Sequence, residues 1–116
     1  MRIAQIAGPF LRVPPHGYGG TERVIALLTD ALVTRGHDVT LFAPGGSQTR
    51  ANLVPVVPEP AWQHQPAYES PHILWNSVVG KVMRTSDDFD VLHSHLELFG
   101  FPLARVAGGR LVSTMH

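Results

Sequence analysis

The chain has 116 residues, of which 44% are hydrophobic and 16% are charged, with a formal net charge of zero and no cysteine. This balance is typical of one globular domain over residues 1–116 and argues against a disordered chain. Without cysteine there is no disulfide, thiolate metal site or cysteine nucleophile. Arg and Lys are too thinly spread for a nucleic-acid-binding surface, and no apolar run approaches the roughly 20 residues that cross a bilayer. The first residues have no signal-peptide pattern, so we expect a cytoplasmic domain with no transmembrane segment.

The first part of the chain predicts a strand, a long loop, a helix and a second strand. The strands are residues 2–7, which are mostly apolar, and residues 38–43, which are rich in β-branched and aromatic side chains. Between them Thr21 is a plausible helix N-cap, and Gly36 predicts a left-handed helix end. The helix has an apolar stripe at helical spacing, made of Val24, Leu27, Leu28, Ala31 and Leu32. The pattern is a βαβ unit, for which parallel strands and a right-handed crossover are expected.

The rest of the chain continues the alternation of strands and helices. Pro55 places the third strand at or near a sheet edge, and Ser70 followed by proline predicts the N-terminus of the second helix. The expected elements are, in order, a strand over residues 52–57, a helix over 71–86, a strand over 90–95, a short helix over 98–107 and a strand over 110–115. This order predicts an α/β fold, with a doubly wound, mainly parallel sheet of about five strands and helices on both faces.

The loop over residues 8–20 is the first candidate for a ligand site, because ligands bind outside the carboxyl ends of the strands in an open parallel sheet. Its length is well above the two to six or so residues usual for such a connection. It ends in Gly17, Tyr18, Gly19 and Gly20, directly at a predicted helix start. Glycines there allow a ligand to come close to the backbone, and free N–H groups favour an anion such as phosphate. Alternatively, the glycines only form the turn, and their spacing does not support a nicotinamide cofactor.

Histidines mark the ends of two predicted strands. His93 and His95 are two residues apart on one strand, so they share a face. We expect His95, where the strand opens into its loop, to make active-site hydrogen bonds rather than to be buried, and His93 to be structural. A metal site would need a third ligand, which His116 could supply only from an adjacent strand, and none is expected. His116 lies on the ligand-binding rim, where it could bind a phosphate or a hydroxyl group.

Four motifs follow one another along the chain: GYGGTE before the first helix, RGHDV before the second strand, DVLHSH at the fourth strand and STMH at the last. Together they resemble the N-terminal domain of the family-4 retaining glycosyltransferases of the GT-B fold. The resemblance covers nearly the whole chain, except residues 58–86. It implies one Rossmann-like, acceptor-side half of a two-domain enzyme whose active site lies in the cleft between the domains. The family's C-terminal domain, which binds the nucleotide sugar, is absent from these 116 residues.

The resemblance implies a reaction and roles for particular residues. Such enzymes pass a sugar from a nucleotide-diphosphate sugar to an acceptor, with retention at the anomeric carbon and usually without a metal or other cofactor. By that similarity Gly19, Gly20 and Thr21 would approach the donor diphosphate or the transferred sugar, where amides at a helix start stabilise the departing diphosphate. His116 matches the histidine that faces the reacting sugar and is the candidate catalytic residue. His95 matches a cleft position on the acceptor side.

The sequence names neither the donor nor the acceptor. Tyr18 and Trp62 are the candidate acceptor contacts, with His64 as a further possibility, whereas Trp75 lies on a helical apolar stripe and is expected in the core. Because the donor-binding domain is missing, we expect the isolated chain to be inactive. The alternatives are another GT-B enzyme, such as an inverting transferase or a nucleotide-sugar epimerase, and a stand-alone flavodoxin-like binding module.

Overall fold

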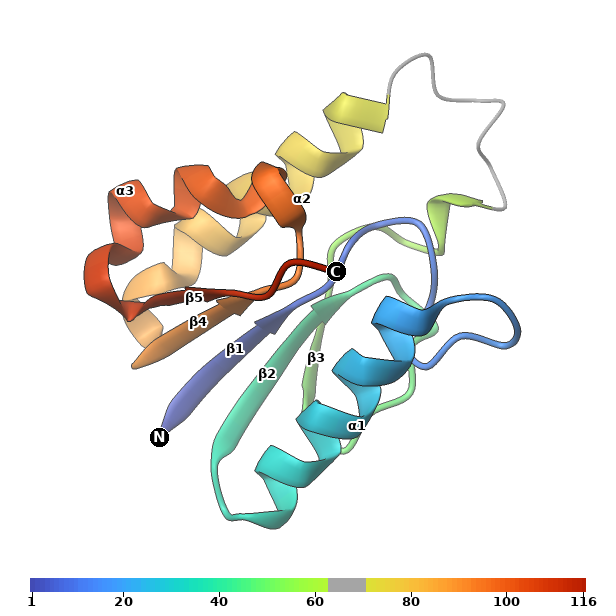
Figure 1. Cartoon of the computed structure of the whole chain (residues 1–116), viewed down its shortest axis with the longest axis horizontal. Coiled ribbons are helices and arrows are strands. Elements are labelled where there is room, and N and C mark those ends of the chain that lie inside the picture. The colour runs from blue at the N-terminus through green and yellow to red at the C-terminus, as the bar shows by residue number, and fades with distance from the viewer. Residues whose placement is uncertain (63–70) are drawn as a thin grey trace.

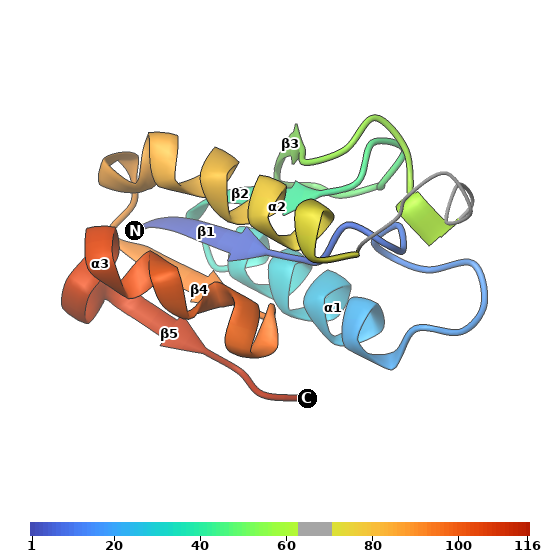
Figure 2. The same ribbon diagram turned by 90° about the horizontal axis from the view of Figure 1, so that it is seen from above.

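The computed structural model describes residues 1–62 and 71–116. Within these residues the strands form one parallel sheet of five, in the order β3-β2-β1-β4-β5, with helices on both faces (Figure 1, Figure 2). The chain starts at the central strand, builds one side of the sheet as far as β3, and then crosses over to add β4 and β5 on the other side. The predicted doubly wound α/β fold is therefore confirmed. His64 and Ser70, which were named from the sequence, lie outside the described residues.

The first βαβ unit agrees with its prediction except at the start of the helix. Its elements are β1 (Arg2–Ile6), α1 (Gly20–Thr34) and β2 (Asp38–Ala43), with β1 and β2 parallel. The helix ends as predicted at Gly36, whose φ is 90°. Thr21 is not the N-cap, because Gly19 holds that position with φ of 147°, and its carbonyl accepts the N–H of Arg23 at 3.1 Å. Glycine adopts this backbone conformation without the steric cost that a side chain would bring.

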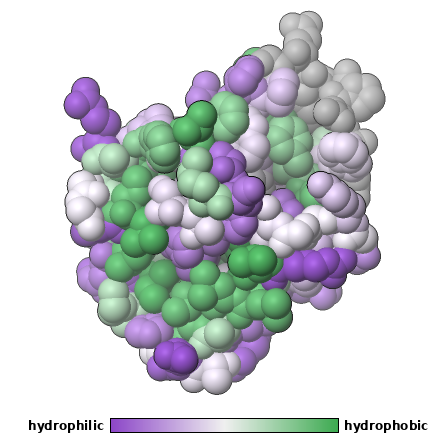
Figure 3. Space-filling view, in the orientation of Figure 1, coloured by the Kyte–Doolittle hydropathy of each residue, from purple (hydrophilic) through white to green (hydrophobic). Residues whose placement is uncertain are grey.

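The apolar stripe of helix α1 is only partly turned toward the sheet, since Leu28 and Leu32 are half-buried. Ile25 and Thr29 are fully buried, whereas Val24 is 47% and Leu27 is 74% exposed. Figure 3 shows the exposed apolar side chains as a green patch over α1. Helical spacing identifies which residues share a face, and the rotation of the helix on the sheet is decided by tertiary packing.

Strand β3 (Asn52–Pro55) lies at one edge of the sheet, as its proline predicted. It pairs in parallel with β2, and Pro55 lies opposite Ala43. The strand ends at Pro55, two residues earlier than predicted. Val56 and Val57 still share backbone hydrogen bonds with Ala43 and Gly45, and they are 1% and 6% exposed.

The second half of the chain covers the opposite face of the sheet and adds its other edge. The elements are, in order, α2 (Pro71–Thr85), η2 (Ser86–Asp88), β4 (Val91–Ser94), η3 (Glu97–Leu103), α3 (Ala104–Ala107), η4 (Gly108–Arg110) and β5 (Leu111–Ser113). The predicted short α-helix is mostly 3₁₀, with Pro102, which has no N–H to donate, inside it. Strands β4 and β5 are both shorter than predicted. None of the described helices is long and apolar enough to cross a membrane.

Each face of the sheet has its own core. The larger core joins strand residues such as Phe42 and Leu92 to α2 and η3, and the smaller one joins Leu41 to α1. Because successive residues of a strand point to opposite faces, Gln5 and His93 lie on the α1 side, directly opposite each other in register. All five strands run in the same direction, so their carboxyl ends and the loops that follow them meet at one edge of the sheet.

Candidate functional site

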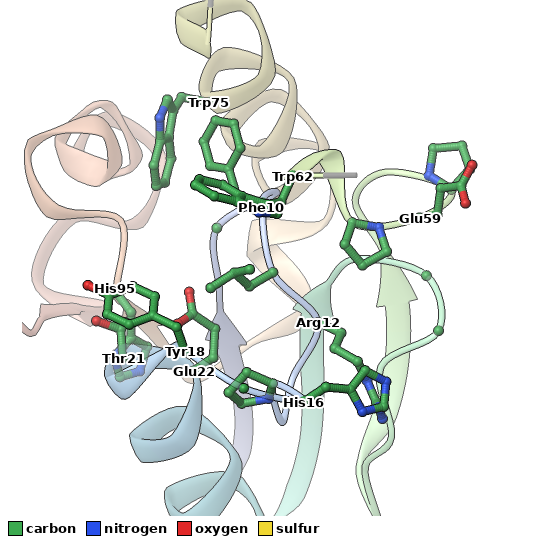
Figure 4. Close-up of a pocket in the computed structure, with 18 of the residues that line it drawn as sticks. Phe10, Arg12, His16, Tyr18, Thr21, Glu22, Glu59, Trp62, Trp75 and His95 are labelled. Atoms are coloured by element: carbon green, nitrogen blue, oxygen red, sulfur yellow. The ribbon is translucent and has the colours of Figure 1, made fainter. Parts of the chain in front are cut away.

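A pocket of about 920 Å³ opens at the carboxyl edge of the sheet (Figure 4). Its walls come from the loop after β1, the first turn of α1, the loops after β2 and β3, the first turns of α2 and the end of β4. The volume is at the upper end of the range for sites that hold a drug-sized ligand. The pocket therefore lies where the sequence placed the ligand site, and it is large enough for a sugar with an attached group.

The loop between β1 and α1 is held in place by backbone and side-chain hydrogen bonds to neighbouring segments. Val13 is fully buried, its N–H donates to Oγ of Ser47 at 3.0 Å, and its carbonyl accepts from Gln48 at 2.9 Å. The carbonyl of Phe10 accepts the N–H of Trp62 at 3.0 Å. These bonds tie the loop to the connections after β2 and β3, which together form one wall of the pocket.

Aromatic side chains form the opposite wall. Trp75 stacks on Phe99 with ring centroids 4.8 Å apart and meets Phe10 edge-to-face at 5.6 Å. The expectation that Trp75 belongs to the core is half right, since it packs against the larger core and also lines the pocket. Trp62 and Tyr18 also line the pocket and are 61% and 93% exposed, so both candidate acceptor contacts lie at this site.

The glycines at the start of α1 have different structural roles. At Gly19 a Cβ atom would lie 2.9 Å from Cβ of Pro15 and 3.0 Å from a carboxylate oxygen of Glu22, and φ is 147°. At Gly20 a Cβ would meet no atom of the described residues within 4 Å. The fold therefore requires glycine at position 19 but not at position 20. Thr21 and Glu22 line the pocket, whereas neither glycine does.

Charged groups around the pocket are mainly acidic. Among its described lining residues are the carboxylates of Glu22, Glu59 and Glu97 and the guanidinium of Arg12. Nη1 of Arg12 is 2.6 Å from Nε2 of His16, another lining residue, so the guanidinium is directed at a neighbour in the same loop. The described lining residues thus present more negative than positive charge to a ligand.

A chain of hydrogen bonds crosses the floor of the site. Oε1 of Gln5 lies 2.8 Å from Nε2 of His95, and Nε2 of Gln5 lies 3.2 Å from Nδ1 of His93. The chain continues outward on both sides, from His93 Nε2 to Oγ1 of Thr114 at 2.6 Å and from His95 Nδ1 to Nε2 of His116 at 3.0 Å. The three histidines named from the motifs therefore lie together, with the His95 ring between those of His93 and His116.

His95 differs from its prediction in one respect. It lines the pocket and makes the expected hydrogen bonds, but it is also buried, with 3% of its surface exposed. The prediction placed it where the strand opens into its loop and expected it not to be buried, whereas contacts with β1 and the C-terminal segment enclose it. Burial, and then the neighbouring His93 and His116, lower the pKa of His95 to about 3.

His93 is half-buried, and burial followed by the charge of His116 lowers its pKa. A histidine with a lowered pKa is neutral at pH 7, so His95 has one protonated and one bare ring nitrogen. Within the described part of the chain, no group of three or more His, Cys, Asp or Glu side chains is arranged to hold a metal ion.

Two residues that sequence reasoning missed complete the site. Gln5 is a buried polar side chain in the central strand, and the signal that could have found it is its place in the otherwise apolar run IAQIA. Glu97 accepts the backbone N–H of His116 at 2.7 Å and has an unusual φ of 55°. No local pattern marks Glu97, because its partner is far away in sequence.

The comparisons with known proteins agree with this fold. The model of the family described as Glycosyltransferase Family 4 matches residues 18–116, and the chain belongs to this family as its N-terminal GT-B domain. Among solved structures the chain is similar to AviGT4, a glycosyltransferase involved in avilamycin A biosynthesis, with 28% identity and a TM-score of 0.67. The match covers 99% of this chain and 31% of AviGT4, so the chain spans about a third of that protein's length. No curated protein matches.

Proposed function

We propose that the chain is the acceptor-side half of a retaining glycosyltransferase that moves a sugar from a nucleotide-diphosphate sugar to an acceptor. The observation that carries the proposal is the position of the pocket. It lies at the carboxyl edge of the sheet, between the glycine loop and the histidine chain, in a domain whose family is defined by glycosyl transfer. A second α/β domain, outside these 116 residues, would close over this edge and bring the nucleotide.

The start of α1 would face the donor. Gly19, Gly20 and Thr21 lie at the start of the first helical turn, where no described side chain caps the backbone N–H groups, and such groups together with the helix dipole stabilise a diphosphate as it departs. The openness at Gly20 supports this role, because the fold does not itself require a glycine there.

His116 would face the reacting sugar as the catalytic residue. It is held on its backbone by the Glu97 carboxylate and on its ring by His95. Both contacts come from the segment around the end of β4, so His116 is oriented by the same residues that line the pocket.

The acceptor would bind between the aromatic wall and the loop after β1, with Tyr18, Trp62 and His95 in contact with it. Aromatic faces suit the C–H surface of a sugar or an apolar ring. The excess of carboxylates over guanidinium groups favours a neutral or positively charged acceptor over an anionic one. The reaction as proposed needs no metal, and the cytoplasmic location expected from the sequence stays a prediction.

The test is an assay of the full reading frame that contains this chain. The protein is incubated with a panel of nucleotide-diphosphate sugars and with neutral, amino-bearing and phosphorylated acceptors, and release of nucleoside diphosphate is measured. NMR of the product then gives the anomeric configuration. Retention supports the proposal, inversion supports the alternative inverting transferase, and conversion of the donor sugar without transfer supports an epimerase.

Two controls belong to this assay. The isolated 116-residue chain is expected to release no nucleoside diphosphate, and robust transfer by it would overturn the claim that a second domain is needed. In the full protein, His116→Ala is expected to lower the rate of transfer by at least about tenfold with little change in folding, since the ring is partly exposed.

A further inference from the structure

Gln5 is an unusual residue for its position. It lies in the middle of the central strand with apolar residues on both sides and is 1% exposed. A buried amide without partners is unfavourable, because it loses its hydrogen bonds to water. Here both ends of the amide have a partner, since its oxygen meets His95 and its nitrogen meets His93. The polar residue therefore belongs to the histidine chain and not to either apolar core.

The amide gives each histidine a different kind of partner. The oxygen of an amide only accepts hydrogen bonds, so Nε2 of His95 must carry the proton that lies between them. The amide nitrogen only donates, so Nδ1 of His93 must be bare, and its Nε2 carries the proton that is directed at Thr114. Each ring is thereby limited to one tautomer.

The tautomer of His95 sets the role of His116. A neutral His95 with its proton on Nε2 has a bare Nδ1, which accepts a hydrogen bond. The ring nitrogen 3.0 Å from that atom is Nε2 of His116, so His116 must donate from Nε2. Because Nε2 is then occupied, a ligand in the cleft meets the other side of the His116 ring.

We propose that Gln5 is a positioning residue, which acts through His95 to fix the orientation and the protonated nitrogen of His116. The proposal rests on the proposed function in one respect, that His116 faces the reacting sugar. Gln5 itself lies behind His95 and touches no substrate. The inference extends the site by one buried residue on β1, the strand from which the glycine loop leaves the sheet.

An amide suits this position better than a carboxylate. The titratable and charged groups around His95 are the rings of His93 and His116 and the carboxylate of Glu97, which accepts from the backbone of His116. Glu22, on the first turn of α1, lines the same pocket. A glutamate at position 5 would favour a charged His95, which has an N–H on both nitrogens. Such a ring cannot accept from His116 and would donate from Nδ1 instead, so His116 would have to place its own proton on Nδ1 rather than on Nε2.

The experiment is NMR of the imidazole nitrogens in the 116-residue chain labelled with ¹⁵N, which needs neither a donor nor an acceptor. At pH 7 we expect His95 and His93 each to show one bare nitrogen at Nδ1 and one protonated nitrogen at Nε2. A His95 that has its proton on Nδ1, or that exchanges between both forms, would overturn the proposal without any variant being made.

Two variants separate positioning from simple packing. Gln5→Met keeps a similar volume but removes both partners, and we expect His95 to exchange between its two tautomers and the His116 signals to shift. Gln5→Glu keeps the shape, and we expect the midpoint of His95 titration to move upward, toward neutral pH. Unchanged tautomers in Gln5→Met, or an unchanged midpoint in Gln5→Glu, would contradict the proposal.

Thr29→Val provides the matched control, since it also replaces a buried polar side chain on the α1 side and has none of the histidine contacts described above. We expect Thr29→Val to leave all histidine tautomers as in the parent chain. Histidine signals that shift as much in Thr29→Val as in Gln5→Met would also contradict the proposed role of Gln5. The NMR test and the sugar-transfer assay are independent. The ring nitrogens can show the expected tautomers even if no sugar transfer is found, and sugar transfer can be found even if Gln5 has no influence on the tautomers.

Discussion

The two faces of the sheet differ in how completely they are packed. On the α2 side, apolar residues of the strands meet α2 and η3 in the larger core, with aromatic pairs such as Phe42 and Phe89 inside it. On the α1 side the core is smaller, Leu27 points into solvent, and the hydrogen-bonded chain from Thr114 to His116 takes the place of apolar contacts. One face therefore supplies most of the stability of the domain, and the other carries its polar chemistry. The predictions below test this division, from the largest expected effect to the smallest.

Phe42→Ala is expected to have the largest effect, because this side chain is 1% exposed and packs edge-to-face on Phe89 at 5.8 Å. Removing a buried phenyl ring costs about 3–5 kcal/mol. Urea unfolding of the 116-residue chain, followed by circular dichroism, measures the loss. A cost under about 1 kcal/mol would mean that the α2 side is not the main source of stability.

Acid is expected to destabilise the domain through the histidine chain. The pKa of His95 is about 3 in the folded protein and returns to an ordinary value near 6.5 on unfolding. Between these values the unfolded chain binds one more proton, so stability is lost as the pH falls from about 6.5 toward 3, with a slope of up to about 1.4 kcal/mol per pH unit.

Urea unfolding at several pH values measures this slope. In His95→Gln, which has no titrating group at this position, the slope between about pH 4.5 and 6.5 should become smaller. An equal slope in the variant and the parent would mean that His95 is not the group responsible.

Gly19→Ala and Gly20→Ala are expected to separate the two glycines of the loop. A Cβ at position 19 would meet Pro15 and would force a strained backbone, at a cost of about 1–3 kcal/mol. At position 20 there is open space, and alanine should leave the stability unchanged or slightly raised. In the full protein, Gly20→Ala should nevertheless slow sugar transfer by crowding the diphosphate. Equal stability losses in both variants would restore the view that both glycines only form the turn.

Thr29→Val is expected to stabilise the domain by about 1 kcal/mol, because the hydroxyl of Thr29 is buried and has no hydrogen-bond partner among the described residues. Valine has nearly the same shape without the polar atom. Thermal unfolding measures the gain, and Thr29→Ser, which keeps the hydroxyl and loses a methyl group, serves as the opposite control. A loss of stability in Thr29→Val would show that the hydroxyl is satisfied in solution.

Leu27→Ala is expected to have the smallest effect on the isolated chain, within about 0.5 kcal/mol, because its side chain is 74% exposed. The same change in the full protein tests whether the apolar patch on α1 is covered there. A clearly larger cost in the full protein than in the isolated chain indicates that another segment packs on it, and equal small costs indicate that it faces solvent in both.

The sequence by itself determined the order of the elements and the edge of the sheet at which the site lies. Strand composition, Pro55 at the third strand and Gly36 after the first helix are local signals, since each reflects the backbone preferences of a few neighbouring residues. The rule that ligands bind at the carboxyl ends of parallel strands then placed the loop after the first strand and His95 at the pocket.

Only the tertiary structure decided which face of α1 is buried and how the site is connected. The rotation of α1 on the sheet is decided by tertiary packing, so Ile25 and not Val24 faces the sheet. The contacts of Gln5 with His93 and His95 span about 90 residues of sequence. They exist because parallel pairing sets β1 beside β4 in one particular register. Local patterns do not contain that register, because it follows from packing the whole sheet.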